Sequence, residues 1–317
     1  MNEQAYRDAE NLLWANAGIE RSESIVTLPR IGARVRVQET GEGEPVVFIH
    51  GGPNSGSTWV ALVEHLEGFH SIVVDRPGTG LSAPHDIDRH NLVAFSERFV
   101  GDVLDGLGID SAHVIASSFG GQIAIRSASA EGHRFRRMVQ LGCPAFAPGM
   151  ETPLFMRALT VAPLRKLINS LPPNERAGDR VLRQIGHGAS LDVGRIPQGF
   201  KDWYLALQKY TDTYKNETKM IGSLGNLFGF DPSLSLTAEI LAAVETPTVF
   251  LWGADDGFGG AEVAKATLDP MPRAHVVMLD DSGHLPWLDD AELTARVSAR
   301  FLRGESVEDT RHRVGHA

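Results

Sequence analysis

The 317-residue sequence contains a single cysteine, no long hydrophobic run and no dense cluster of lysine or arginine. Cys143 alone cannot form a disulfide within the chain, which fits a reducing compartment. No apolar run approaches the ~20 residues that span a bilayer, so we expect no membrane-spanning helix. Lys+Arg number 30 against Asp+Glu 40, a net charge of −10, so nucleic-acid binding is not expected.

The start of the sequence has no basic segment followed by an apolar segment and a small-residue cleavage site, so a secretory signal is not expected there. We therefore expect a cytoplasmic protein. Hydrophobic content of 42% and charged content of 22% are ordinary for a globular chain. His312 and His316 have the spacing of metal ligands on a helix, but no third ligand accompanies them. We expect no metal site and no cofactor, and the sequence does not decide the oligomeric state.

Apolar runs of strand length alternate with segments of helical spacing along most of the chain. From residue 46 onward the strand-like runs are continuous, as expected for parallel strands covered on both faces. This alternation predicts an α/β protein with a mostly parallel, doubly wound sheet. The predicted strands are 34–38, 46–50, 71–75, 112–116, 137–141, 248–252 and 275–279.

The alternation stops between about residues 144 and 235, where helix-like pieces are interrupted by proline and glycine and no strand is evident. We interpret this stretch as a helical lid inserted into the sheet domain, although the helices could also pack on the sheet as ordinary layers. The predicted core then comprises residues 1–143 and 236–303, and the polar residues 304–317 form a flexible tail.

The most informative local pattern surrounds Ser118. It follows the apolar run 112–116 and precedes a helix-like stretch, 122–130, so the serine lies between a strand and a helix. A turn that sharp requires very small residues two positions before and after the serine, and Ala116 and Gly120 meet this requirement. The hydroxyl is thereby presented above the sheet edge, where backbone amides can stabilise an oxyanion.

Three further blocks occur at the ends of predicted strands, and together with the serine turn they resemble the α/β-hydrolase fold family, particularly its lidded serine hydrolases. The family turn reads Gly-x-Ser-x-Gly, from which Ala116 is a mild departure. The resemblance runs from about residue 35 to 302 and is weakest in the predicted lid. The three blocks are His50-Gly51-Gly52-Pro53, Asp75-Arg76-Pro77-Gly78-Thr79-Gly80-Leu81-Ser82 and Ser282-Gly283-His284.

The resemblance implies a catalytic triad in the chain order Ser118, Asp256, His284. A serine hydroxyl needs a base within hydrogen-bond reach, and His284 follows a strand in a loop over the same sheet edge. Family members carry the acid in a Gly-x-x-Asp pattern, which here selects Asp256, with the neighbouring Asp255 as the alternative. Cys143 follows a core strand, so burial is favoured over a role as nucleophile.

The oxyanion donors implied by the resemblance are backbone N–H groups. One is Phe119, directly after the nucleophile, and the other is Gly52, with Gly51 as its close rival. We interpret His50 as a residue that shapes this loop. The block that begins at Asp75 is expected to support the site from behind, without direct chemistry.

Serine in place of aspartate at this turn favours hydrolysis of an ester, thioester or lactone of a small, moderately apolar substrate through an acyl-enzyme. Alternatives within the fold are a C–C bond hydrolase, an aminopeptidase resembling proline iminopeptidases, and a cofactor-free peroxidase-like member. Outside enzymology, the same fold serves as a ligand-binding receptor or scaffold. The candidate pocket walls are Gly51, Trp59, Phe119, Phe146, Phe155, Trp203, Tyr204, Phe228, Phe258 and Trp287.

Overall fold

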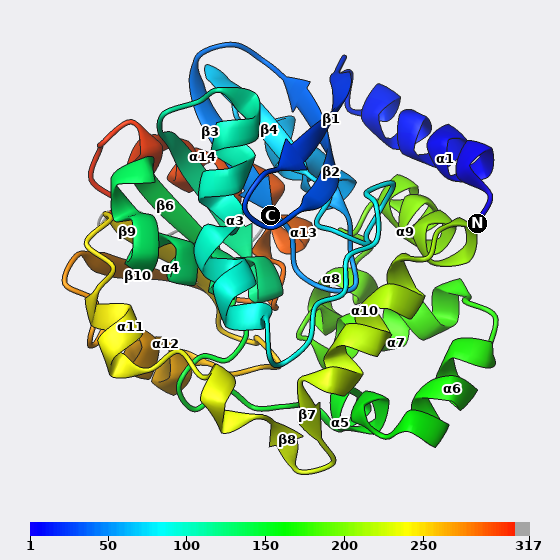
Figure 1. Ribbon diagram of the computed structural model, residues 1–317. Coiled ribbons are helices and arrows are strands. Elements are labelled where there is room, and N and C mark those ends of the chain that lie inside the picture. Colours follow the sequence, from blue (N-terminus) through cyan, green and yellow to red (C-terminus); the bar gives the residue numbers. More distant parts are fainter. Residues whose placement is uncertain (308–317) are drawn as a thin grey trace.

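The computed structural model describes residues 1–307 and contains an eight-stranded sheet in the order β1-β2-β4-β3-β5-β6-β9-β10 (Figure 1). Residues 308–317, most of the predicted tail, lie outside the described residues. The strands of the sheet are β1 (Ser22–Leu28), β2 (Ala33–Thr40), β3 (Glu44–Ile49), β4 (Phe69–Val74), β5 (Ala112–Ser117), β6 (Phe135–Leu141), β9 (Thr248–Gly253) and β10 (Ala274–Leu279).

The sheet is mostly parallel, which confirms the predicted fold class. β4, β3, β5, β6, β9 and β10 pair in parallel, whereas β2 pairs antiparallel with both β1 and β4. Every residue of β5 and of β9 is buried, which explains why their sequences are mostly apolar rather than alternating. The seven predicted strands are present, and β1 was not predicted. Its first four residues are exposed and mostly polar, so the apolar signal was missing.

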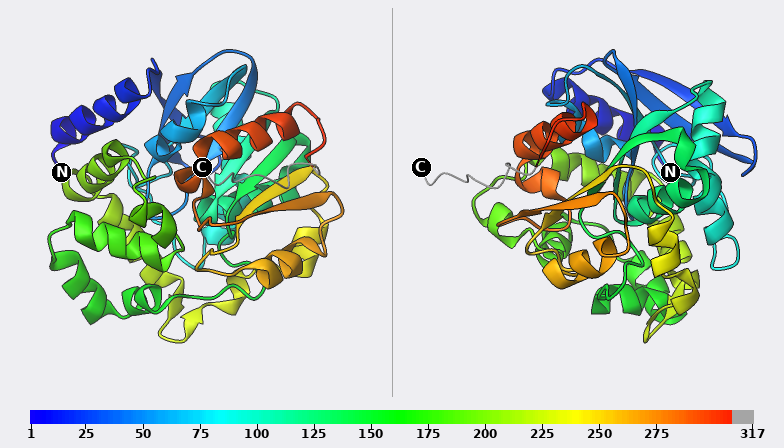
Figure 2. Two further views of the ribbon diagram at one scale, coloured as in Figure 1. Left: turned by 180° about the vertical axis from the view of Figure 1, so that it is seen from behind. Right: turned by 90° about the vertical axis from the view of Figure 1, so that its left-hand side faces the viewer.

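Helices cover both faces of this sheet. α3 (Leu92–Leu107) packs against α4 (Ser118–Glu131) on the face toward the viewer in Figure 1. α14 (Ala291–Leu302) covers the opposite face, seen from behind in Figure 2, and contacts α2 (Val60–Val63). Shorter elements complete the core: η1 (Gly56–Trp59), η2 (Gly132–Arg134), α11 (Ala238–Ala242), α12 (Ala261–Leu268) and α13 (Pro286–Asp289).

Residues 144–235, here called the cap segment, contain helices and one small hairpin beside the sheet (Figure 1). The prediction that this segment holds no strand was wrong in one detail, because a two-stranded hairpin follows the last helix. Each of its strands is only two residues long, too short to produce an apolar pattern. The elements are α5 (Leu154–Thr160), α6 (Ala162–Ser170), α7 (Glu175–Gln184), α8 (Gly188–Asp192), α9 (Gln198–Tyr210), α10 (Thr213–Ser223), β7 (Gly225–Asn226), β8 (Gly229–Phe230) and η3 (Pro232–Leu234).

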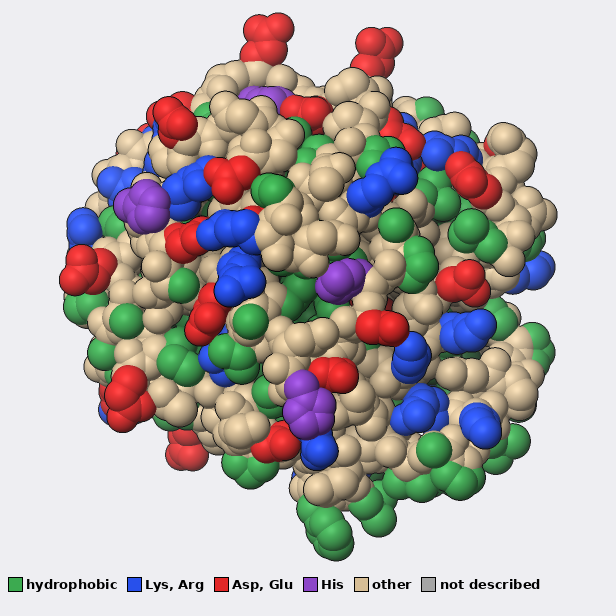
Figure 3. Space-filling view, viewed as in Figure 1, with side chains coloured by type: hydrophobic (Ala, Val, Ile, Leu, Met, Phe, Trp, Pro, Cys, Tyr) green, Lys and Arg blue, Asp and Glu red, His purple; other side chains and the backbone are tan. Residues whose placement is uncertain are grey.

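The turn of this hairpin is an exposed apolar surface. Leu227 is 55% exposed and Phe228 is 89% exposed. Hydrophobic side chains gather at the foot of the molecule, at the hairpin (Figure 3). The sequence-based suggestion that Phe228 forms a pocket wall was therefore wrong, since the short turn carries its ring into solvent.

The N-terminal helix α1 (Glu3–Asn16), which was not predicted, lies against α9 of the cap segment. Its buried face carries the acidic Glu10 between Tyr6 and Trp14, so the apolar spacing expected of a packed helix is broken. The Asn2 amide donates a hydrogen bond to the Tyr210 carbonyl at 2.8 Å, which ties the start of the chain to the end of α9.

Glu10 belongs to a buried network of charges in the core. Arg36 donates to Glu10 Oε2 at 2.6 Å and to Asp75 Oδ2 at 3.3 Å, and the side chains of all three residues are inaccessible to solvent. Burial opposes the charge of Glu10, but the hydrogen bonds and charge of Arg36 lower its pKa. Burial raises the pKa of Asp75. The network connects α1 to the loop that follows β4.

Candidate active site

Ser118 lies where β5 ends and α4 begins, and its backbone has a left-handed conformation with φ of 54°. Such a conformation strains a residue that has a side chain and is typical of functional sites. Its neighbours make the turn possible. Ala116 is fully buried, and a Cβ at Gly120 would lie 2.1 Å from the Ile49 carbonyl oxygen. Contact with β3 therefore requires glycine at position 120.

His284 and Asp256 form a buried pair beside this turn. Nδ1 of His284 lies 3.0 Å from Oδ1 and 2.9 Å from Oδ2 of Asp256. Asp256 follows β9 and His284 follows β10, so adjacent parallel strands bring together residues 28 positions apart. The structure thus pairs His284 with Asp256 rather than with Asp255, which is exposed.

The Asp256 carboxylate is held from two other directions. Its Oδ2 accepts a hydrogen bond from the Cys143 amide at 2.8 Å, and its Oδ1 accepts one from the Phe258 amide at 2.9 Å. Because a carboxylate only accepts hydrogen bonds, Nδ1 of His284 carries a proton, and in the neutral imidazole the lone pair is then on Nε2. This is the tautomer that a general base requires.

Nε2 of His284 is buried and makes no hydrogen bond with any residue that the structure describes. His284 and Ser118 both line the same cavity. Hydrogen bonds between a base and its nucleophile are often long before substrate binds, and they shorten in the reacting complex. The arrangement therefore leaves one nitrogen of His284 free for proton transfer within the cavity.

The loop after β3 approaches Ser118 from the other side. A Cβ at Gly51 would lie 2.8 Å from Ser118 Cβ, so only glycine allows this approach. His50 Nδ1 donates to the Gly51 carbonyl at 2.7 Å, and His50 Nε2 accepts from the Arg76 amide at 3.1 Å. Burial and the charge of Arg76 hold the pKa of His50 well below its ordinary range. His50 is thus a neutral residue whose two nitrogens are both used within the loops.

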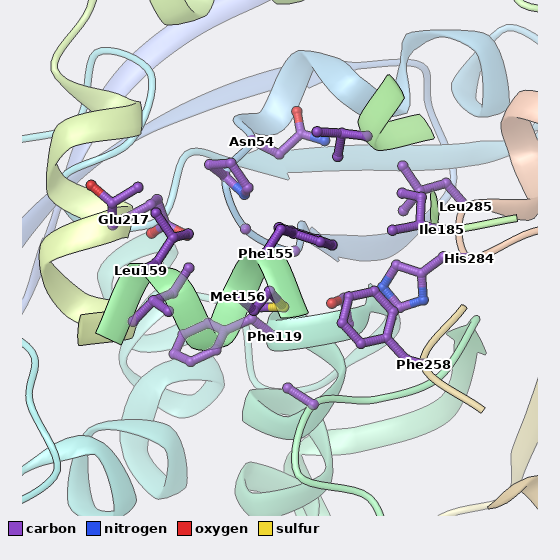
Figure 4. Close-up of a pocket in the computed structure, with 18 of the residues that line it drawn as sticks. Asn54, Phe119, Phe155, Met156, Leu159, Ile185, Glu217, Phe258, His284 and Leu285 are labelled. Atoms are coloured by element: carbon purple, nitrogen blue, oxygen red, sulfur yellow. The ribbon is translucent and has the colours of Figure 1, made fainter. Parts of the chain in front are cut away.

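The cavity has a volume of about 140 Å³ and is predominantly apolar. In Figure 4, His284 and Phe258 lie at one end of the cavity, and Glu217 of α10 lies at the other. Within the described part of the chain, Glu217 and His284 are the only titratable acidic or basic side chains besides Cys143 and two tyrosines that line it. The apolar lining residues are Pro53, Phe119, Ala145, Phe146, Met150, Phe155, Met156, Leu159, Val181, Leu182, Ile185, Phe200, Met220, Ile221, Leu224, Phe230, Phe258 and Leu285.

Most of the suggested pocket walls line this cavity, but three tryptophans do not. Gly51, Phe119, Phe146, Phe155, Tyr204 and Phe258 are lining residues. Trp59, Trp203 and Trp287 lie outside the lining and are buried at 0%, 0% and 1% exposure. Trp59 and Trp287 stack with ring centroids 4.4 Å apart, and Trp203 packs on Phe200 of the same helix. Their size favours core packing, which the sequence alone does not separate from ligand contact.

Cys143 also lines the cavity but is 1% exposed. Burial and the charge of Asp256 raise the pKa of the Cys143 thiol well above its ordinary value. The thiolate is the nucleophilic form of cysteine, so this environment keeps Cys143 unreactive. No group of three or more metal-ligating side chains occurs among residues 1–307, and no helix there is long and apolar enough to cross a membrane.

Glu217, His187 and Asp289 were not singled out in the sequence, and Arg76 was expected only as part of a block that supports the site from behind. Arg76 and Glu217 form a buried ion pair of 2.9 Å between the core and the cap segment. His187 Nδ1 donates to the Asp289 carboxylate, also at 2.9 Å and buried, behind the loop that carries His284. Each pair joins residues about 100 or more positions apart, and no local pattern in the sequence signals such a contact.

Comparison with known proteins identifies the class. Residues 46–297 match the model of the "Alpha/beta hydrolase family", and the chain therefore belongs to that family. It is 27% identical over 277 residues to a 2-hydroxy-6-oxononadienedioate/2-hydroxy-6-oxononatrienedioate hydrolase of Cupriavidus pinatubonensis, covering 85% of this chain and 90% of the relative.

Esterases are also among the similar proteins. The chain is 25% identical to Lipase 3 of a Moraxella species, covering 83% of this chain and 78% of the lipase. The crystal structure of carboxylesterase CesB from Bacillus subtilis superimposes with a TM-score of 0.72 at 19% identity, covering 96% of this chain and 99% of that one. This structural likeness shows a shared fold. The relatives thus include both C–C bond and ester hydrolases.

Proposed function

We propose that the protein is a serine hydrolase that cleaves a carboxylic ester, thioester or lactone through an acyl-enzyme. His284 Nε2 removes the proton of Ser118 as its oxygen attacks the substrate carbonyl. Asp256 holds His284 in the required tautomer and stabilises the imidazolium that forms. The alcohol departs with that proton, and His284 then deprotonates the water that releases the acid.

The observation that supports this most is the convergence of three features on one cavity. Ser118 at φ 54° and His284, whose Nε2 has no partner among the described residues, line the same cavity, and three hydrogen-bond donors hold the Asp256 carboxylate. Gly52 and Phe119 line the same cavity, and their amides are the proposed donors to the oxyanion.

The cavity supports an uncharged, apolar acyl group. Its volume of about 140 Å³ is close to that of an engineered cavity of ~150 Å³ in another protein that accepts benzene. An acyl group of benzene size or a short alkyl chain therefore fits. Burying such a group against the apolar lining contributes roughly 25 cal/mol per Å² of apolar surface removed from water.

The second candidate, C–C bond hydrolysis, is favoured by the first relative described above, whose named substrates are dicarboxylates. A buried carboxylate needs a partner of opposite charge. Within residues 1–307, no lysine or arginine lines the cavity, whereas the acidic Glu217 does. This electrostatic setting disfavours a dicarboxylate and favours the ester hypothesis.

Two substrate panels test the proposal. Aryl esters of neutral acids with increasing acyl size are compared with 2-hydroxy-6-oxo-dienoates, using the wild type and Ser118→Ala. We expect Ser118-dependent hydrolysis of the small aryl esters, with kcat/KM falling once the acyl group exceeds the cavity. Faster turnover of the dienoates would favour C–C hydrolysis instead. Absence of Ser118-dependent labelling by a fluorophosphonate would reject both and favour a ligand-binding protein.

A further inference from the structure

α10 of the cap segment docks on the loop that follows β4, through one face of the helix. The Gly80 amide donates to Thr213 Oγ1 at 2.9 Å, and Asn216 Nδ2 donates to the Gly78 carbonyl at 2.8 Å. Glu217, one position later, accepts from Arg76 at 2.9 Å. Positions 213, 216 and 217 lie on one side of a helix. The cap segment is therefore attached directly to the loop behind the candidate oxyanion hole.

Arg76 links this contact of the cap segment to the loop after β3 in the candidate active site. Its Nε donates to the His50 carbonyl at 2.9 Å, and its Nη2 donates to the Gly51 carbonyl at 3.0 Å as well as to Glu217. Its Nη1 has no partner among the described residues, so these bonds determine the orientation of the guanidinium. Arg76 is fully buried and the side chain of Glu217 is 3% exposed, so water does not screen their attraction.

The peptide between Gly51 and Gly52 links this network to catalysis. The carbonyl and the N–H of a trans peptide point in opposite directions within one rigid plane. The Gly51 carbonyl is held by Arg76 Nη2 and His50 Nδ1, so the Gly52 N–H is directed away from them. Gly52 is the proposed second oxyanion donor. Glu217 also packs against this peptide, since a Cβ at Gly52 would lie 2.2 Å from Glu217 Oε2.

We infer that Glu217 is a positioning residue: through Arg76 it sets the orientation of the Gly52 amide and so couples seating of the cap segment to assembly of the oxyanion hole. This inference rests on the proposed function for its catalytic consequence. The geometric coupling from Glu217 to the Gly52 amide does not depend on it. Loss of the Glu217 charge weakens one of the two anchors of Arg76 Nη2, and the peptide plane gains freedom to rotate.

The kinetic test compares wild type, Glu217→Gln, Glu217→Ala and a matched control, Asp179→Asn. Asp179 pairs with Lys201 at 3.1 Å entirely within the cap segment, so its variant removes an ion pair without touching the core. Removing a whole oxyanion donor costs roughly 10²–10³ in rate. A displaced donor should cost less, and we expect kcat on an aryl ester to fall roughly tenfold in Glu217→Gln and further in Glu217→Ala, with KM little changed.

A trifluoromethyl ketone inhibitor separates positioning from general loss of structure, because its adduct with serine places an oxyanion in the hole. Its affinity should fall by the same factor as kcat/KM in Glu217→Gln, and remain within twofold of wild type in Asp179→Asn. A change in KM alone would make Glu217 a simple pocket wall and overturn the inference. So would a decrease in kcat with unchanged inhibitor affinity.

An NMR experiment tests the setting of the Gly52 amide without measuring activity. Three Gly-Gly pairs occur in the sequence, at 51–52, 120–121 and 259–260. Labelling glycine with ¹⁵N and carbonyl ¹³C therefore selects the amides of Gly52, Gly121 and Gly260 in a carbonyl-edited spectrum. Glu217→Gln should shift the Gly52 resonance and leave Gly260 in place, while Asp179→Asn shifts neither. An unmoved Gly52 resonance overturns the inference even if Glu217→Ala fails to fold.

The outcomes separate the two proposals. If Gly52 shifts while Ser118-dependent hydrolysis is absent, the coupling stands and the proposed function fails. If hydrolysis depends on Ser118 but neither the Gly52 shift nor the inhibitor affinity responds to Glu217→Gln, the proposed function stands and the positioning role fails. Arg76→Lys adds a check, since lysine lacks the fork that holds two carbonyls and Glu217 together. Its effect should not add to that of Glu217→Gln.

Discussion

The molecule contains two buried histidine–aspartate pairs that have the same local geometry and different surroundings. In both, the histidine Nδ1 lies 2.9 Å from a carboxylate oxygen. Nε2 of His284 has no hydrogen-bond partner among the described residues, whereas Nε2 of His187 accepts from the Leu285 amide at 3.1 Å. A carboxylate–imidazole pair therefore indicates chemistry only when the second nitrogen remains available to a cavity.

The hydrogen-bond partners of the two carboxylates also differ. Asp289 accepts hydrogen bonds from His187, from the hydroxyls of Ser190 and Ser282, and from the Gly283 amide. All four of these donors have a structural role in the fold. Because Gly283 and Leu285 flank His284, the second pair holds the loop that carries the proposed base. It joins that loop to the cap segment, which contributes His187 and Ser190.

The largest expected difference between the His284–Asp256 and His187–Asp289 pairs is in how much a mutation of the aspartate lowers kcat. Asp256→Asn should lower kcat on an aryl ester by roughly 10³–10⁴, because an asparagine can hold His284 in the wrong tautomer. Thermal unfolding of the variant, followed by circular dichroism, checks that it is folded. A decrease of less than tenfold in a folded variant would contradict the role proposed for Asp256.

Asp289→Asn should instead affect stability. Asp289 is 8% exposed and its carboxylate accepts four hydrogen bonds, and a hydrogen bond to a charged group typically contributes about 1.5–3 kcal/mol, so we expect a loss of that size in urea unfolding. Turnover by the folded fraction should decrease less than tenfold. If Asp289→Asn reduced kcat as much as Asp256→Asn at unchanged stability, the distinction between the pairs would be wrong.

Lowering the pH should remove the contribution of Asp289 to the free energy of unfolding. Burial opposes its ionisation, but the hydrogen bonds from His187, Ser190 and the Gly283 amide lower the pKa of Asp289 in the folded state. A depressed pKa stabilises the fold above the unfolded value, about 3.9 for Asp, and this contribution is lost as pH falls through the folded pKa. The stability difference between wild type and Asp289→Asn should thus shrink below about pH 4. Urea unfolding at pH 3–6 measures it, and a difference that grows on acidification contradicts the assignment.

The smallest effect is expected at Trp203, which was suggested as a pocket wall and is buried in the core. Its indole N–H has no partner among the described residues, so Trp203→Phe removes an unsatisfied donor while leaving a small void. These effects oppose each other, and we expect a stability change of about 1 kcal/mol or less. KM for aryl esters should stay within twofold of wild type. A larger KM change would return Trp203 to the substrate site.

The sequence predicted those parts of the structure that depend on neighbours along the chain. The buried strands, the turn at Ser118 and the glycines near it carry local steric requirements, so their positions could be inferred. The pairing of His284 with Asp256 followed from family resemblance. Glu217, His187 and Asp289 could not be inferred, because each acquires its partner only when the cap segment meets the core. Helix α1 was not predicted, because the acidic Glu10 on its buried face breaks the apolar spacing.

The buried network of Glu10, Arg36 and Asp75 has a practical consequence for trimming the chain. The family match begins at residue 46, beyond both Glu10 and Arg36. A fragment cut to that boundary would expose the edge of β4 that β2 covers and leave Asp75 without its arginine. The segment that the family model matches thus lacks residues that complete the sheet and this network, and expression of this protein should retain its first helix.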